Sequence, residues 1–253
     1  MSDLPSYVWV LVMVGVIGIP GTTCVVLYQG AVAAGCDRRK ALVVAAVAGI
    51  AMGGWIVASG LLAAVGAYRQ GPAVTIPWLG VALVGALVAA LLAARIPIVS
   101  RILADPGTAA RLALPEMFRG VGATFLVVLA LGQLPAVFAL PAGLGDLAVG
   151  IAAPFVARRL RRGVAGRGAV WFNVLGIVDL VVAVATGFLT SEGPAQVLPA
   201  WPTSSSAAIA LLPLALIPTT AVPLAAALHL VSLRKLRTDA RAAALNGQPA
   251  TAR

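Results

Sequence analysis

Residues 41–66 read ALVVAAVAGIAMGGWIVASGLLAAVG, a stretch of 26 residues without a charged side chain. A helix of this length rises about 1.5 Å per residue and is long enough to cross the hydrocarbon core of a bilayer, which is about 30 Å thick. The rest of the chain has the same character, because 61% of its 253 residues are hydrophobic and only 10% are charged. Soluble domains carry about 25% charged residues. The composition therefore predicts an integral membrane protein.

Six further apolar runs flank this one, and together they predict an all-α bundle of seven transmembrane helices. We expect one domain over residues 1–237, followed by a small, polar and disordered tail over 238–253. The fifth span is the shortest, and a tight turn at Leu140-Pro141-Ala142-Gly143 is expected to separate it from the fourth. The predicted spans are 7–28, 41–66, 76–97, 119–139, 142–157, 169–190 and 206–233.

Basic residues alternate between the two ends of these spans, and this pattern predicts the orientation. Seventeen of the 18 Lys and Arg residues fall in or beside the first, third and fifth connections and the C-terminal segment, and only Arg69 falls on the other side. Cytoplasmic loops carry the excess of Lys and Arg. We therefore expect the N-terminus outside and the C-terminus in the cytoplasm, in the cell (inner) membrane of a bacterium.

The net charge of +10 could also suggest a nucleic-acid-binding protein. A nucleic-acid surface needs a continuous basic face, whereas here the basic residues form short clusters between apolar runs. The lipid bilayer is the expected environment, and the anionic lipid headgroups of its cytoplasmic side are the expected partner, at about 1 kcal/mol per basic residue near the surface. No nucleic-acid partner is expected.

Two segments interrupt the regular pattern. Residues 98–116 predict a short interfacial helix broken at Asp105-Pro106-Gly107. Prolines fall inside the first and seventh spans, where each removes a backbone hydrogen bond that a nearby threonine can replace. One interpretation is ordinary kinking, and the other is that the two broken helices line a cavity. The prolines are Pro20, Pro213, Pro218 and Pro223, and the threonines are Thr22, Thr23, Thr219 and Thr220.

Three polar residues are expected near the middle of the membrane. Asp146 lies 12 residues before Arg158, and Asp179 lies ten residues after Ala169. These separations place the carboxylates about 18 Å and about 15 Å from the same side. Gln133 is expected at about the same level on the fourth helix. An ionisable group at this depth costs about 2.5–3.5 kcal/mol or more, so it faces protein or water.

Small residues lie before and after each aspartate at helical spacing. Gly143, Gly150 and Ala153 share a face with Asp146. Gly176, Ala183 and Gly187 share a face with Asp179, and Asn173 lies at the edge of that face. Because small stripes let helices approach closely in lipid, we expect the two carboxylates to interact, directly or through Gln133, Asn173 or a water.

Two interpretations of this polar group remain open. The aspartates could join helices through hydrogen bonds alone, as polar residues often do in bundles. Alternatively, they could bind a proton or a cation, since carboxylates that share a site favour reversible protonation. Two accessory residues are weighed beside them. Arg119 is expected to be a cytoplasmic anchor paired with Glu116, and His229 is expected to be a capping or interfacial residue near the cytoplasmic end.

The remaining chemistry-bearing residues form no known catalytic or cofactor motif. Cys24 and Cys36 lack metal-ligand spacing, and a single histidine excludes a bis-His haem held by this chain alone. Residues 206–233 contain no lysine for a retinal Schiff base. We expect no metal, no cofactor and no catalytic residues.

Three functions are consistent with these observations. The first is a small proton- or cation-coupled transporter or channel-like protein that uses Asp146 and Asp179. The second is a non-catalytic membrane subunit or scaffold that assembles through its small-residue faces, as a homo-oligomer or with another membrane protein. A membrane-embedded enzyme comes third, because no nucleophile–base pair is visible.

Overall fold

The computed structural model describes residues 4–71, 76–164, 166–192, 196–203 and 205–245. Within these residues the chain contains helices and no strands, and 79% of the chain is helical. Six helices are long and apolar enough to cross a membrane, and a bent pair makes up to seven. The expectation of an all-helical membrane bundle is therefore confirmed at this level.

The first two long helices come close to their predicted bounds. Helix α1 covers Ser6–Ala33 and contains Pro20, and α2 covers Arg38–Ala64. Asp37 caps α2, because its carboxylate accepts a hydrogen bond from the Lys40 backbone N–H at 2.9 Å. This bond holds the pKa of Asp37 below its usual range. Helix α2 packs along α1.

The third span is bent. Helix α3 covers Trp78–Ala93, and α4 covers Pro97–Ala104 at an angle of 77° to it. Sixteen residues span only about 24 Å, so α3 is shorter than the hydrocarbon core is thick. As the sequence suggested, the chain breaks at 105–107, and a short helix, α5, follows at Thr108–Leu112. Four of its five residues are buried, so α5 belongs to the bundle.

The fourth and fifth spans differ from the prediction. The fourth begins at Thr108 and ends at Ala130, and it combines α5, a 3₁₀ helix η1 (Pro115–Gly122) and helix α6 (Ala123–Ala130). Helix α7 then covers Ala136–Arg161. The turn expected at residues 140–143 is wrong: Pro141 lies inside α7, and the chain turns at 131–135, where Gly132 adopts a φ of +71° and Pro135 caps α7.

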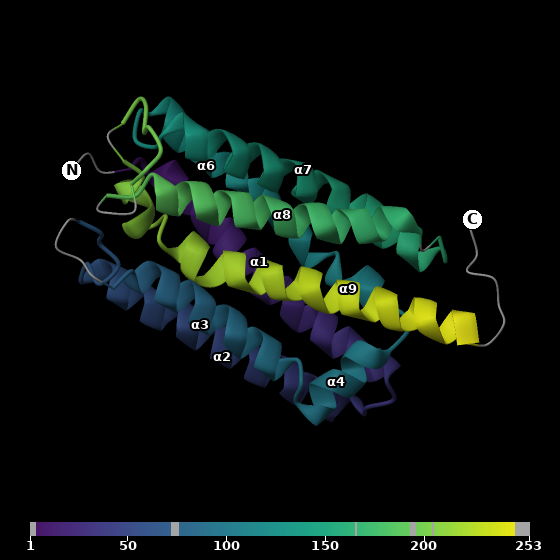
Figure 1. Cartoon of the computed structure of the whole chain (residues 1–253). Coiled ribbons are helices and arrows are strands. Elements are labelled where there is room, and N and C mark those ends of the chain that lie inside the picture. Colours follow the sequence, from purple (N-terminus) through teal and green to yellow (C-terminus); the bar gives the residue numbers. More distant parts are fainter. Residues whose placement is uncertain (1–3, 72–75, 165, 193–195, 204, 246–253) are drawn as a thin grey trace.

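Helix α8 covers Arg167–Leu189, close to the predicted sixth span. The predicted seventh span contains a 3₁₀ helix η2 (Ala207–Ala210), a π-helix η3 (Ile217–Ala221) and the start of helix α9 (Val222–Leu245). Because α9 continues to Leu245, residues 238–245 of the expected disordered tail are helical, and 246–253 lie outside the described residues. Figure 1 shows α1 beginning at one end of the bundle and α9 ending at the other.

Threonines and one tryptophan compensate for the prolines of the seventh span. Pro223 has no N–H to donate to the Thr219 carbonyl, and Trp55 Nε1 of α2 donates to that oxygen instead, at 2.7 Å. Thr219 and Thr220 donate to the carbonyls four residues earlier, and Ser59 of α2 donates to Thr219 Oγ1 at 2.7 Å. The broken start of α9 is therefore fixed to α2 by polar contacts.

Candidate functional site

The candidate site lies around Arg119, which is only 3% exposed although it is charged. Arg119 belongs to η1, and the 3₁₀ geometry explains its direction. Side chains three residues apart eclipse one another in a 3₁₀ helix. Glu116, Arg119 and Gly122 therefore share one face, and all three are buried. Pro115 starts this helix, where its missing N–H costs no hydrogen bond.

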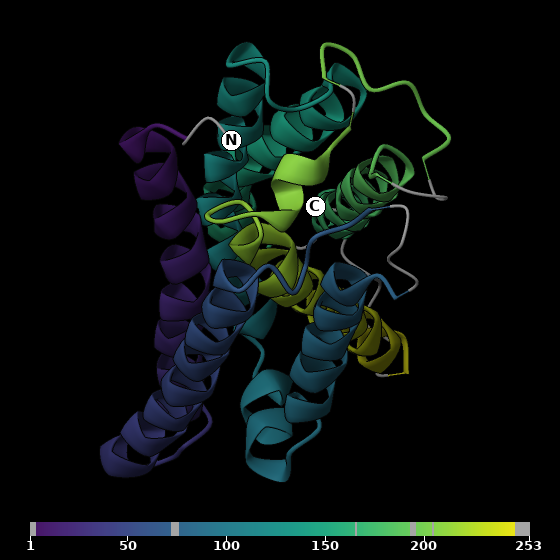
Figure 2. The same ribbon diagram turned by 90° about the vertical axis from the view of Figure 1, so that its left-hand side faces the viewer.

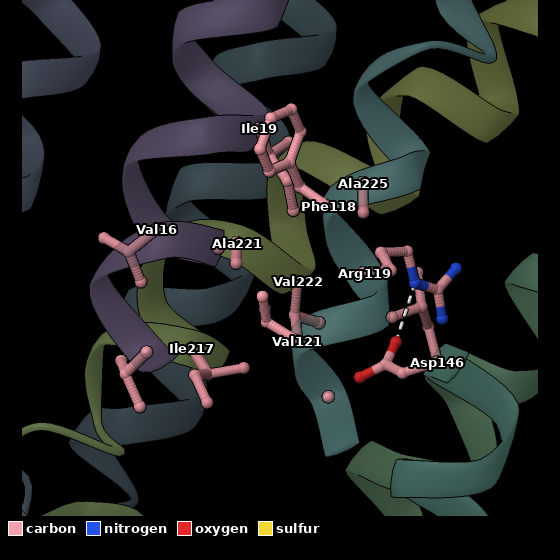
Figure 3. Close-up of a pocket in the computed structure, with 14 residues that line it drawn as sticks. Val16, Ile19, Phe118, Arg119, Val121, Asp146, Ile217, Ala221, Val222 and Ala225 are labelled. Atoms are coloured by element: carbon pink, nitrogen blue, oxygen red, sulfur yellow. Dashed lines mark hydrogen bonds and ion pairs between the residues drawn. The ribbon is translucent and has the colours of Figure 1, made fainter. Parts of the chain in front are cut away.

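Two aspartates from neighbouring helices bind the Arg119 guanidinium. Its Nε donates to Asp146 Oδ1 of α7 at 2.7 Å, and its Nη2 donates to Asp179 Oδ2 of α8. Figure 3 shows Arg119 and Asp146 pointing toward each other at the edge of a small cavity. Arg119 bridges the two aspartates, whereas the sequence analysis expected them to interact directly or through Gln133, Asn173 or a water.

The two aspartates lie at matching depth because their helices run side by side in opposite directions. Asp146 lies ten residues from the start of α7, and Asp179 lies ten residues from the end of α8. Each is therefore about 15 Å from the same end of the bundle. Two glycines bring the partners close: a Cβ at Gly145 would overlap Asp179 Oδ1, and a Cβ at Gly176 would overlap the His229 ring.

His229 and Asn173 complete the other side of the site. Asn173 Nδ2 donates to the Ala169 carbonyl, so its Oδ1 accepts from His229 Nδ1 at 3.0 Å. Nδ1 then carries the proton of a neutral ring, and Nε2 accepts from Arg119 Nη1 at 3.0 Å. The Phe172 ring packs edge-on against the imidazole, with ring centroids 5.4 Å apart.

Glu116 is the most enclosed carboxylate of the site. It is 1% exposed, and neither of its oxygens has a hydrogen-bond partner. Glu116 Oε2 lies 3.3 Å from His229 Nε2 and 3.8 Å from Arg119 Nη1.

The carboxylates of this site outnumber the Arg119 guanidinium. Two aspartates and one glutamate face one guanidinium. His229 adds a positive charge only if it is protonated. Uncompensated charge is very costly in a low-dielectric interior. The two aspartates are the more accessible groups of the site, because their side chains are 14% and 12% exposed, whereas those of Arg119 and Glu116 are almost fully enclosed.

The aspartates are also the part of the site that meets open space. A cavity of about 30 Å³ lies between α1, η1, η3 and α9 and reaches Arg119 and Asp146. A water needs about 10–15 Å³, so the cavity accommodates water beside the ion pair. Both α1 and η3 line this cavity, but α1 is one continuous helix through Pro20, so only the seventh span is a broken helix there.

Three expectations about individual residues are corrected by these positions. Gln133 lies in the turn between α6 and α7, away from the aspartates, because α6 ends at Ala130. Arg119 is a buried counter-ion and not a surface anchor. His229 is 1% exposed and faces the core, since α9 runs 16 residues beyond it to Leu245. Glu116 was noticed only as a partner of Arg119, and the three-residue spacing of Glu116, Arg119 and Gly122 was the signal for a shared face.

The described residues contain no group of three or more His, Cys, Asp or Glu side chains arranged to hold a metal ion. The carboxylates converge on the guanidinium and leave no shared central position.

Comparison with known proteins identifies a family without an assigned role. No curated protein and no solved structure matches the chain. A family described as a domain of unknown function, DUF8737, matches residues 76–237. The match includes η1, α7, α8 and the part of α9 that carries His229, and so contains all of the residues around Arg119. The chain belongs to the DUF8737 family.

Proposed function

We propose that the protein is a small proton- or cation-coupled transporter or channel-like protein of the bacterial cell membrane, with Asp146 and Asp179 as its ion-binding residues. One observation carries the proposal: a single buried guanidinium faces one buried and two partly buried carboxylates. A site used only to join helices gains most when its charges balance, because every unpaired buried charge weakens the fold.

The proposal assigns a different role to each residue. Asp146 and Asp179 take up and release the proton or cation. Arg119 keeps the two carboxylates together and lowers the cost of the empty state. His229, fixed in one tautomer by Asn173, holds the far side of the guanidinium. The intramembrane depth of the aspartates and the adjoining cavity give the ion a position between the two sides of the membrane.

The orientation proposed for the chain is N-terminus outside and C-terminus in the cytoplasm, with seven crossings. The opposite ends reached by α1 and α9 support an odd number of crossings (Figure 1). Arg119 is buried and no longer counts as a surface residue. The other Lys and Arg residues are then distributed 16 to one between the two sides of the membrane. A reporter that is active only in the cytoplasm should give signal when fused after Arg253 and none after Ser191. The opposite pattern at either site would overturn the orientation.

The functional test uses purified protein in vesicles. Wild type should dissipate an imposed pH gradient in the presence of the coupled solute, which is sought among a panel of small cations and neutral solutes. Asp146→Asn and Asp179→Asn should abolish this flux, because asparagine keeps the shape and most hydrogen bonds but cannot change charge. Their thermal unfolding midpoints should remain near that of wild type.

Asp239→Asn is the matched control, since Asp239 is an exposed aspartate paired with Lys235 on the last turns of α9. It should leave the flux unchanged. Flux that survives both core substitutions, or a wild-type protein that dissipates no gradient with any solute, would reject the proposal.

A second candidate function is a non-catalytic subunit that assembles with a partner. It is favoured by α2, of which only Ala41, Ser59 and Ala63 are buried, and by the open space beside Gly53 and Gly54. In lipid, such small residues permit close helix contacts. Substituting Gly54 with leucine should then dissociate a complex that is stable in mild detergent. Unchanged assembly would reject this second candidate, and transport would remain as the proposed function.

A further inference from the structure

A groove on the bundle leads from its outer end to Asp146, one of the two proposed ion-binding aspartates. Helix α3 contributes Leu79 and Leu83 to one wall, and α8 contributes Ala183 and Val184 to the other. Phe125 and Phe138 lie between them. Figure 2 shows α3 and α8 on either side of the first turns of α9. The groove has about 90 Å³ of space for water-sized molecules and about 750 Å³ when its open side is counted.

The polarity of the groove changes along its length. Gln70, Ser191 and Ser206 lie at its outer end, where the helices begin or end. Leu180 and Asp146 lie at its inner end. The 11 residues from Leu180 to Ser191 correspond to roughly 16 Å along α8. The groove thus has a polar mouth, apolar walls and one carboxylate at its base.

Asp146 is the single charged residue among those that line the groove in the described chain. Its Oδ1 accepts the hydrogen bond from Arg119, and its Oδ2 lies on the side of Gly122. The carboxylates of the site outnumber its guanidinium, as described above. A bound molecule is therefore favoured if its charged end is a cation.

The walls of the groove indicate the chemical character of the uncharged part of the ligand. Apolar side chains gain free energy when they cover apolar surface, and the Phe125 and Phe138 rings meet edge to face with centroids 5.1 Å apart. Aromatic rings also attract organic cations through their faces. A lipid tail would fit the walls but would leave the carboxylate without a partner, and an inorganic cation would leave the walls uncovered.

We propose that this groove binds an amphipathic organic monocation, with its apolar body between α3 and α8 and its charge against Asp146. The inference rests on the proposed function and names its substrate class. The same carboxylate holds either a proton or the cation, so entry of the cation releases the proton. Exchange of an organic cation for a proton follows from this competition.

Binding of benzyltrimethylammonium tests the groove directly. This ion joins one aromatic ring to one permanent charge, and benzenesulfonate is an anion of comparable size. Wild type in lipid nanodiscs should bind the cation in equilibrium dialysis and should not bind the anion. Because protons compete for Asp146, cation binding should weaken as the pH is lowered.

Two substitutions distinguish the contribution of the groove walls to binding from the contribution of the Asp146 charge. Ala183→Phe fills the groove without changing charge and should weaken cation binding about tenfold or more. Val181→Phe is its matched control, since Val181 lies on the same helix but this residue is 60% exposed on the surface of the bundle. It should bind as wild type does. Asp146→Asn should abolish cation binding and its pH dependence.

The outcomes separate this inference from the proposed function. Equal binding by wild type and Ala183→Phe, or binding of the anion as well as the cation, would overturn the groove as the binding site. A wild type that dissipates a pH gradient with other solutes but binds no benzyltrimethylammonium overturns this inference alone. Cation binding without any proton release would retain the groove and reject the proton-coupled function.

Discussion

The peripheral flank (α2 and α3) and the polar core (η1, α7, α8 and α9) both belong to segments apolar enough to cross a membrane, but they bury their residues very differently. Helix α2 buries three residues, and α3 buries none. The polar core buries its helices on small-residue faces and encloses Arg119 and Glu116. Helices that are hydrophobic on every side face lipid. The difference indicates that the interior is formed by the helices that carry charged residues and small-residue faces.

Arg119 offers the largest test of this difference. Arg119→Ala removes the cation that faces three carboxylates and should lower the free energy of unfolding by about 3–5 kcal/mol. Thermal or denaturant unfolding in detergent would measure the loss. Arg95→Ala at the end of α3 is the control, since Arg95 is exposed, and it should change stability by less than about 0.5 kcal/mol. Equal effects of the two substitutions would show that the polar core carries no special share of stability.

Much of the fold and part of the site could be predicted from the sequence. Apolar runs and basic clusters located the long helices, and the depth of Asp146 and Asp179 along adjacent small-faced helices predicted that they meet. These features depend on composition and on distance along one helix. Both are local properties that a sequence carries directly.

The rest depended on how the chain bends. Arg119 was placed at the surface because the fourth span was assumed to begin there, whereas η1 carries it inside the bundle from an earlier start at Thr108. Because of that error, the turn was predicted at Pro141 and not at 131–135, and Gln133 was predicted at the membrane depth of the aspartates. His229 was judged by its distance from Arg234, although the direction of its side chain depends on packing against Gly176.

Glycines in the polar core are in closer contact with neighbouring helices than glycines in the flank, and we expect a smaller difference in stability from this contrast. A Cβ at Gly145 would overlap Asp179, so Gly145→Ala should cost about 1–3 kcal/mol of unfolding free energy. Gly54 of α2 has nothing within 4 Å of an added Cβ. Gly54→Ala should therefore be neutral or slightly stabilising, because alanine favours helices. Unfolding midpoints of the two variants would be compared. A Gly145→Ala protein as stable as wild type would mean that Asp179 is not held tightly.

Trp55 joins the flank to the core and should have an intermediate effect. Trp55→Phe keeps the aromatic ring but removes the donor to the Thr219 carbonyl, which Pro223 also leaves unbonded. We expect a loss of about 1–2 kcal/mol. Trp171→Phe is the control, because Trp171 is 59% exposed on α8. If both substitutions have the same small effect, the flank is attached mainly by apolar packing.

The smallest expected effect concerns the start of the flank and depends on pH. The Asp37 carboxylate caps α2, and the bond from the Lys40 N–H lowers its pKa. A carboxyl whose pKa is lower in the folded state stabilises the fold above its ordinary value of 3.8, and this contribution disappears as the pH falls through the lowered pKa. Asp37→Asn retains a good capping residue but does not titrate. Wild type should thus lose a small stability advantage over Asp37→Asn between about pH 6 and about pH 3. The carboxylates around Arg119 are common to both proteins, so their protonation cancels in the difference between the two unfolding midpoints. A difference that stays constant with pH would show that the cap acts through its shape alone.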